Sequence, residues 1–244
     1  MKVLSPTNIK GRGVRAFSLL EVLVVMNIIA WMSWFSIVSL STFISASSLS
    51  QGVSSIGGVL EQARTQAMLL NTYVYVGFFE SDGSLPEAVK PAPAGAGRLW
   101  VGAVATKDGT IGYDQSDASS TIPSSNLIPV GKLQMIKNVH LSETNPFSAR
   151  GLITNTVRIG ASLDSTNAPF GWPIDSKKSV GGFTTGVIRF DPRGTASIPG
   201  NSTPAEGIQI AVLPTRGKFM ASSNINGAIL QLESFTGMIR TFRP

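Results

Sequence analysis

The chain contains no cysteine, a single histidine and few charged residues. Without cysteine it can form neither a disulfide framework nor a thiolate metal site, although this absence does not identify a cellular compartment. The single histidine, His140, cannot build a metal cluster of several histidines, and a Ser-His-Asp triad would depend on it alone. We therefore expect no cofactor, no metal site and no enzymatic activity, with His140 a structural or surface residue.

Charged residues make up only 14% of the chain, and they are unevenly placed. Residues 22–46 form a run of 25 positions without one charge. A helix of that length spans roughly 37 Å, whereas the hydrocarbon core of a bilayer is about 30 Å thick. A cleaved secretory signal has an apolar region of only about 7–15 residues. We therefore expect a membrane-spanning segment, and a plain uncleaved signal anchor is the alternative.

The excess of positive charge lies at the N-terminus. The first 16 residues hold four basic side chains and no acid, whereas the remainder holds 16 basic and 14 acidic side chains. Basic residues before an apolar segment favour a cytoplasmic N-terminus. The net charge of +6 is thus mainly a property of this leader, and no basic patch with interleaved aromatic residues predicts nucleic-acid binding.

One acid, Glu21, lies inside the apolar segment. A carboxylate at the centre of a bilayer costs about 2.5–3.5 kcal/mol on insertion scales, and an intramembrane acid is a functional candidate for that reason.

The surrounding sequence RAFSLLEVLVV, residues 15–25, resembles the N-terminal motif of type IV prepilins and type II secretion pseudopilins. In that family a basic leader precedes a Phe, and a Glu follows at the fifth mature position.

The resemblance implies a processing site. A prepilin peptidase would cut between Ala16 and Phe17, and Phe17 would then be N-methylated. The family usually has Gly before the cut, where this chain has Ala16. Gly13 cannot substitute, because a cut after it would move Glu21 to the eighth mature position. The implied partners are the peptidase, other pilins or pseudopilins in a fibre, an inner-membrane assembly platform and membrane lipid, with no nucleic acid.

Glu21 has a specific candidate partner. Cleavage would free an α-amine on Phe17 that is largely protonated near neutral pH, and the first turn of a helix favours negative charge. Glu21 could pair with this amine in its own chain or in a neighbouring chain. The resemblance implies the intermolecular pair, which helps set subunit register in a fibre. The alternative is a snorkelling acid at the membrane surface.

The remaining chain predicts an α+β fold. We expect a leader over residues 1–16, a long helix over 17–70 with a transmembrane part at 17–46, and a β-rich periplasmic domain over 71–244. Three glycines predict a bend near residues 52–58, because each costs about 1 kcal/mol relative to Ala in a helix. Apolar residues recurring every three or four positions then predict an amphipathic half that packs on a mainly antiparallel sheet, as in pilins. These residues are Val53, Ile56, Leu60, Ala63, Ala67 and Leu70.

Strands alternate with long turn-rich segments in the predicted domain. Strands are expected at residues 72–79, 98–106, 133–141, 157–160 and 207–213, a strand–turn–strand unit at 186–196 and a terminal hairpin at 228–242, with loops at 80–97, 107–130 and 142–182 and a short helix near 146–150. The fragments ARTQA, RFDPRGTA and TGMIR resemble minor H-type pseudopilins and the Verru_Chthon cassette protein D group. No functional residues carry over from this part of the resemblance.

Three functions are weighed from these observations. The first is a prepilin-like structural subunit, a minor pilin or pseudopilin, held in the inner membrane with its domain in the periplasm and then assembled into a fibre. The second is a membrane-anchored periplasmic binding domain that does not polymerise. The third is a tethered enzyme dependent on His140.

Asp108, Asp114 and Asp117 share one loop and could bind a cation, but their spacing does not match an EF-hand, so a solvated loop is favoured.

Overall fold

The computed structural model describes most of the chain after the leader. The described residues are 18–87, 93–111, 122–148, 151–160, 170–172, 181–183, 185–199, 205–220 and 226–244, with the side chains of residues 35–46, 171–172, 181–182, 185 and 220 excluded. The chain divides into two compact units, residues 1–43 and 44–244, and each is described by itself. The expected leader lies outside the described residues.

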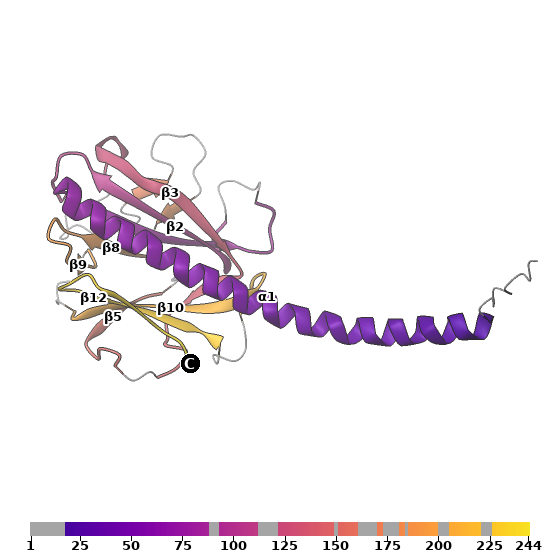
Figure 1. Cartoon of the computed structure of the whole chain (residues 1–244). Helices are drawn as coiled ribbons and strands as arrows, with labels where there is room; N and C mark the ends of the chain where they lie inside the picture. The colour runs from indigo at the N-terminus through magenta and orange to yellow at the C-terminus, as the bar shows by residue number, and fades with distance from the viewer. Residues whose placement is uncertain are drawn as a thin grey trace, which may run out of the picture. The chain divides into compact units, whose positions relative to one another are not determined.

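One helix and two sheets make up most of the described structure (Figure 1). The elements are α1 (Leu19–Leu70), β1 (Val74–Asp82), β2 (Gly97–Thr106), η1 (Ser124–Asn126), β3 (Leu127–Lys137), β4 (Val139–Ser142), β5 (Thr156–Ile159), β6 (Phe170–Trp172), β7 (Gly181–Phe183), β8 (Thr185–Phe190), β9 (Ala196–Ser197), β10 (Gly207–Arg216), β11 (Phe219–Met220), β12 (Ala228–Glu233) and β13 (Ile239–Phe242).

The strands form two larger sheets and one hairpin. Sheet A has five strands in the order β3-β2-β1-β8-β9, and all its pairs are antiparallel. Sheet B has six strands, with β11-β10-β12-β13 in one path and β4 and β5 both paired to β10. The β5–β10 pair is parallel, whereas the other pairs of sheet B are antiparallel. The third sheet is the two-stranded β6–β7 hairpin.

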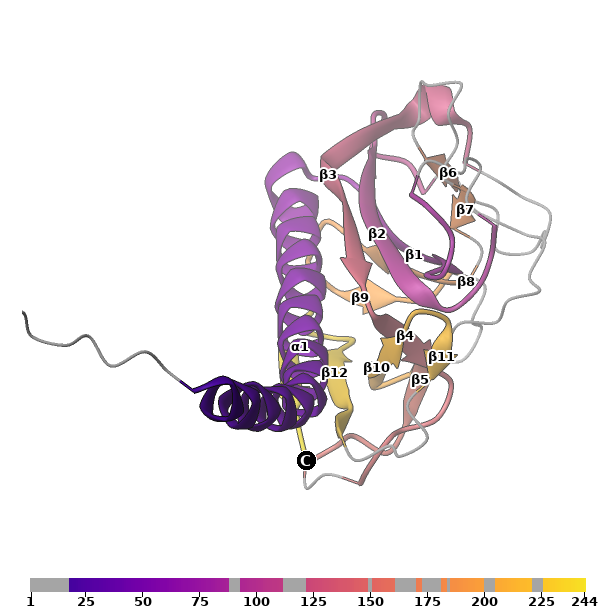
Figure 2. The ribbon, with the colours of Figure 1, turned by 90° about the vertical axis from the view of Figure 1, so that its right-hand side faces the viewer.

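The core of the second unit lies between α1 and the two sheets. From Leu49 onward, the apolar face of α1 is buried together with side chains of both sheets, such as Val76 from sheet A and Ile210 from sheet B. Figure 2 shows this part of α1 running along one side of the strands. A second apolar cluster lies on the other face of sheet A, where Phe170 and Phe183 of the hairpin cover Tyr75.

The predicted fold class is wrong for this structure. Within the described ranges, no helical stretch has both the length and the apolar character needed to cross a membrane. The structure is mostly antiparallel β-sheet, and its strands form three sheets where a single sheet was expected. The reason is that β10 pairs with β4, β5, β11 and β12, and β12 pairs with β13, which makes a second sheet and gives α1 two sheets to pack against.

The helix is unbroken at residues 52–58, where a bend was predicted. α1 remains helical through all three of its glycines. Val53, Ile56 and Leu60 are buried around them, and burial of such side chains contributes about 1.5–3 kcal/mol each, which exceeds the helical cost of Gly. A Cβ at Gly52 would lie 3.0 Å from Ile136 Cγ2, so this glycine lets the helix approach sheet A closely.

The strand predicted at residues 133–141 is two strands in different sheets. β3 belongs to sheet A and β4 to sheet B, and the chain turns between them at Asn138, whose φ is 59°. The short helix expected near 146–150 is not formed at 146–148, where residues 146 and 147 are bends, and 149–150 lie outside the described residues. The β2, β5 and terminal β12–β13 predictions are confirmed to within one or two residues.

A buried polar pair joins the two sheets. Glu80 of β1 and His140 of β4 are 5% and 9% exposed, and the Glu80 Oε2 atom lies 2.8 Å from His140 Nδ1. The other carboxylate oxygen of Glu80 accepts a hydrogen bond from the backbone N–H of Leu141. His140 is therefore a structural residue that connects sheet B to sheet A.

Replacing Glu80 tests this connection. Glu80→Leu leaves the Leu141 N–H and His140 without their acceptor, and each buried group left unpaired costs about 1–3 kcal/mol. We expect the free energy of unfolding to fall by about 2 kcal/mol or more in urea titrations of the detergent-solubilised chain. Glu80→Gln keeps a carbonyl oxygen for Leu141 and should lose less. A Glu80→Leu protein as stable as the wild type would show that the pair does not hold the sheets together.

Candidate functional site

The first turn of α1 is closed by Ser18. The Ser18 hydroxyl accepts a hydrogen bond from the backbone N–H of Glu21 at 3.1 Å. Its carbonyl oxygen accepts the N–H groups of Glu21 and Val22, at 3.0 and 3.2 Å. Ser18 is thus the N-cap of the helix and Glu21 its third residue, which is the Ser-x-x-Glu arrangement of a capping box.

Glu21 is the sole charge at this end of the helix. Its side chain is exposed, and no other charged residue occurs from Ser18 to Leu60. Its position in the first turn is favourable, because the N-terminal end of a helix carries partial positive charge. The hydrogen bonds of Ser18 go to backbone N–H groups and not to the Glu21 carboxylate, so the carboxylate is presented at the end of the helix.

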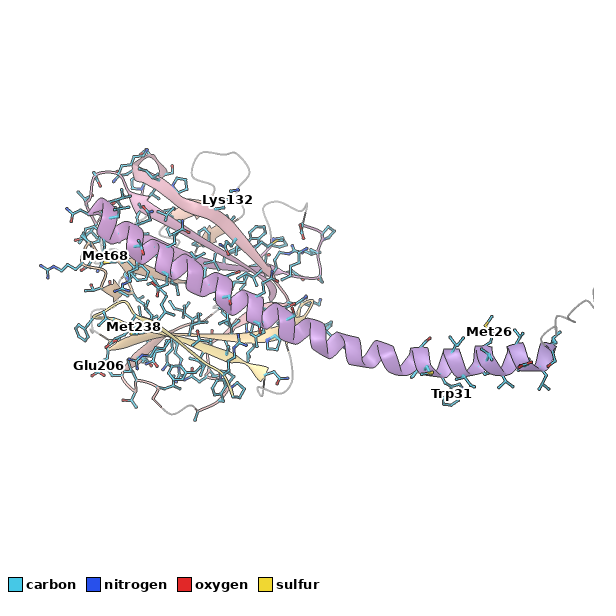
Figure 3. All side chains as sticks on the ribbon, viewed as in Figure 1. Met26, Trp31, Met68, Lys132, Glu206 and Met238 are labelled. Carbon is cyan, nitrogen blue, oxygen red and sulfur yellow. The ribbon has the colours of Figure 1, made fainter. Side chains whose placement is uncertain are left out.

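Residues 19–34 of α1 expose apolar side chains on every side. Figure 3 shows Met26 and Trp31 pointing to different sides of the helix, and they are 66% and 69% exposed. Helices of soluble domains normally keep a polar face, whereas a helix that is apolar all round is typical of a segment buried in a large core or in lipid. The exposed apolar residues here are Leu19, Leu20, Val22, Leu23, Val24, Val25, Met26, Ile28, Ile29, Trp31, Met32 and Trp34.

Asn27 and Ser33, the two uncharged residues of this segment with an amide or hydroxyl side chain, bond to the helix itself. Asn27 Nδ2 donates to the carbonyl oxygen of Leu23 at 3.0 Å, and Ser33 Oγ donates to that of Ile29 at 2.8 Å. Each of these side chains thus satisfies one hydrogen-bond donor within the helix, which lowers the cost of placing the segment in apolar surroundings.

The structure places one of the three predicted site residues. Glu21 lies in the first turn of α1, whereas Ala16 and Phe17 lie outside the described residues. Ser18 was not predicted from the sequence, although the Ser-x-x-Glu spacing before an apolar run is a sufficient signal for it.

Of the three acids in the acidic loop, only Asp108 lies within the described residues. Asp108 accepts hydrogen bonds from the backbone N–H and hydroxyl of Thr110, at 3.0 and 2.8 Å, and from Asn126 Nδ2 at 2.9 Å. The bonds from Thr110, followed by the Asn126 bond, hold the pKa of Asp108 below its ordinary value. Asp114 and Asp117 lie outside the described residues, and within those residues no three His, Cys, Asp or Glu side chains could hold a metal ion.

Substitution of Ser18 tests the cap. Ser18→Ala removes the side-chain acceptor of the Glu21 N–H, a change that costs about 1 kcal/mol at a helix N-cap. We expect the Glu21 amide to exchange its hydrogen roughly fivefold faster in micelles, as measured by NMR. Ser33→Ala is the matched control, because it removes a hydroxyl that bonds within the helix, and it should leave Glu21 exchange unchanged. Equal exchange rates in Ser18→Ala and wild type would contradict the cap.

No family model, no curated protein and no solved structure matches this chain, so its function is argued from its own residues.

Proposed function

We propose that this protein is a prepilin-like structural subunit, a minor pilin or pseudopilin of a type IV pilus or a type II secretion-like pseudopilus. The observation that carries the proposal is a helix that is apolar on all sides over residues 19–34 and has one carboxylate, Glu21, in its capped first turn. The sequence around it, with a basic leader and the Phe17–Glu21 spacing, resembles the prepilin processing motif.

The exposed apolar side chains need a cover, because water is a poor solvent for so large an apolar surface. Before assembly that cover is the inner membrane, with the basic leader on the cytoplasmic side and the β-rich unit in the periplasm. After assembly it is the equivalent segment of neighbouring subunits, which replaces lipid contacts by helix–helix packing. Small side chains such as Ala30 and Ser33 allow helices to approach closely.

Glu21 gives this packing a register. A carboxylate in an apolar bundle is costly unless a positive charge lies beside it. Cleavage after Ala16 would create such a charge on the α-amine of Phe17, four residues before Glu21. Because the Ser18 cap leaves the Glu21 carboxylate at the helix end, an amine of an adjacent subunit can reach it. One relative position of two helices then satisfies both charges.

Processing is the first requirement of this function. In cells with an active prepilin peptidase, intact mass and N-terminal sequencing should show a chain that begins with N-methylated Phe17. Ala16→Gly restores the residue that the family usually has before the cut, and we expect a larger processed fraction than in wild type. A chain that retains its leader in such cells, in wild type and in Ala16→Gly alike, would exclude a pilin function and leave an anchored domain that does not polymerise.

Glu21→Ala tests the assembly role separately from membrane insertion. The substitution removes a charge from the apolar segment, so the membrane fraction should hold as much protein as in wild type or more. The amount recovered in sheared fibres should fall at least tenfold, because the Phe17 amine loses its partner. Glu61→Ala is the control, since Glu61 is an exposed acid of the same helix that lies 4.0 Å from Arg64. Normal fibre incorporation of Glu21→Ala would refute the registering role.

A further inference from the structure

Three distant parts of the chain meet where α1 enters the second unit. Arg243, which follows β13, donates a hydrogen bond from Nη1 to Ser50 Oγ of α1 at 3.0 Å. A Cβ placed on Gly52 would lie 3.0 Å from Ile136 Cγ2, near the end of β3. The start of this unit's helix, the end of β3 and the residues after β13 therefore form one end of the unit, which we call the entry end.

The β10–β11 hairpin is fixed to the entry end through its base. The Asn138 carbonyl oxygen, between β3 and β4, accepts a hydrogen bond from the Thr215 N–H at 2.9 Å, and the Asn138 N–H donates to the Gly97 carbonyl oxygen at 2.8 Å. A Cβ on Gly97 would clash with the carbonyl oxygen of Gly217, so the hairpin turn lies directly against the start of β2. The hairpin is thus held at this end of the unit by backbone contacts.

The hairpin presents an aromatic ring next to two basic side chains. Arg216 and Phe219 are cross-strand partners, so their side chains lie on the same face of the hairpin. Lys218 Nζ lies 6.0 Å from the centroid of the Phe219 ring. Arg216 and Lys218 are exposed, and Phe219 is 70% exposed. Exposed apolar rings beside Lys and Arg are typical of surfaces that bind at the boundary between lipid headgroups and acyl chains.

Basic side chains outnumber acids on the surface of the entry end. Among its described side chains that reach the surface, the basic ones are Lys137, Arg216, Lys218 and Arg243, and the acidic ones are Asp82 and Glu87. Glu87 forms an ion pair with Lys137. Hydrogen bonds from Ser84, and to a smaller extent the charge of Lys218, lower the pKa of Asp82. With both acids ionised, four positive charges against two negative ones leave a net charge of +2.

The entry end lies close in the chain to the predicted membrane-spanning run. That run ends at Ala46, and Ser50 follows four residues later, which is roughly 6 Å along a helix. The polar headgroup layer on each side of a bilayer is about 5–7 Å thick. A bilayer around the apolar segment therefore brings its headgroups to the level of Ser50, to which Arg243 is bonded.

We propose that the entry end docks on anionic phospholipid headgroups, with the Phe219 ring in the interface and the neighbouring basic side chains on the phosphate groups. Each basic side chain near an anionic surface contributes about 1 kcal/mol. This attraction is weak for a free protein, but α1 holds the surface at a high effective concentration beside the membrane. The inference shares with the proposed function only the bilayer around the apolar segment, and it holds equally for an anchored domain that does not polymerise.

Two matched phenylalanines allow lipid contact to be measured. Because the chain has no cysteine, Phe219→Cys and Phe235→Cys each provide a single site for a nitrobenzoxadiazole label. Phe235 is the control, since it is 69% exposed but lies elsewhere on the unit. A Cβ on Gly237, in the same turn, would lie 2.9 Å from Arg64 Cδ. Arg64 is 14 residues, or roughly 21 Å along α1, from Ser50.

The full-length labelled chains are incorporated into nanodiscs, one copy per disc, made of phosphatidylcholine with or without phosphatidylglycerol. With phosphatidylglycerol, spin-labelled lipid should quench the label at residue 219 about fivefold more than the label at residue 235. In phosphatidylcholine alone this difference should largely disappear. Equal quenching at the two positions with anionic lipid, or undiminished quenching at residue 219 without it, would overturn the proposal.

The same experiment separates this inference from the proposed function. A chain that does not enter the discs would overturn both the inference and the membrane step of the proposed function. A chain that enters the discs with residue 219 unquenched would overturn the inference alone. Protection of the label from a water-soluble quencher only in discs with two copies would identify a second subunit as the occupant, and would also overturn the inference.

Charge reversal then assigns the contact to the hairpin. Arg216→Glu combined with Lys218→Glu should lower the quenching at residue 219 to the level at residue 235, because both phosphate-binding charges become repulsive. Lys132→Glu combined with Arg193→Glu is the matched control, since it makes the same change in net charge at exposed positions away from the entry end, and it should leave the quenching unchanged. Urea unfolding checks that the variants are folded. Unchanged quenching in the folded hairpin variant, or an equal loss in the control, would contradict the assignment.

Discussion

The burial of one face of α1 against two sheets is the interaction on which the second unit depends. Leu49, Ile56 and Ala67 share a single core with side chains from sheet A and from sheet B. Burial on this scale supplies the main stabilising term of a domain, so the two sheets share a core because the same helix covers both. The Glu80–His140 pair adds a polar connection between the same sheets, in a place where water cannot replace it.

Local patterns in the sequence predicted the elements better than their assembly. The three- and four-residue spacing of Val53, Ile56 and Leu60 identified the buried face of α1, because that spacing depends only on helix geometry. α1 stays helical through its three glycines because tertiary packing outweighs their low helix propensity. The division at Asn138 was missed because the apolar pattern continues on both sides of it, and a positive φ at Asn leaves little trace in the sequence.

Local and long-range arrangements differ in how far the sequence could reveal them. Ser18 and Glu21 are three residues apart, so their capping arrangement follows from local spacing alone. A row of polar residues on sheet B, from Arg158 through Gln209 and Gln231 to Arg240, crosses four strands, one of which pairs in parallel. Register across such distant segments depends on the complete fold, and a shift of one residue in any strand would turn its side chain to the other face. The row could therefore be recognised only from the structure.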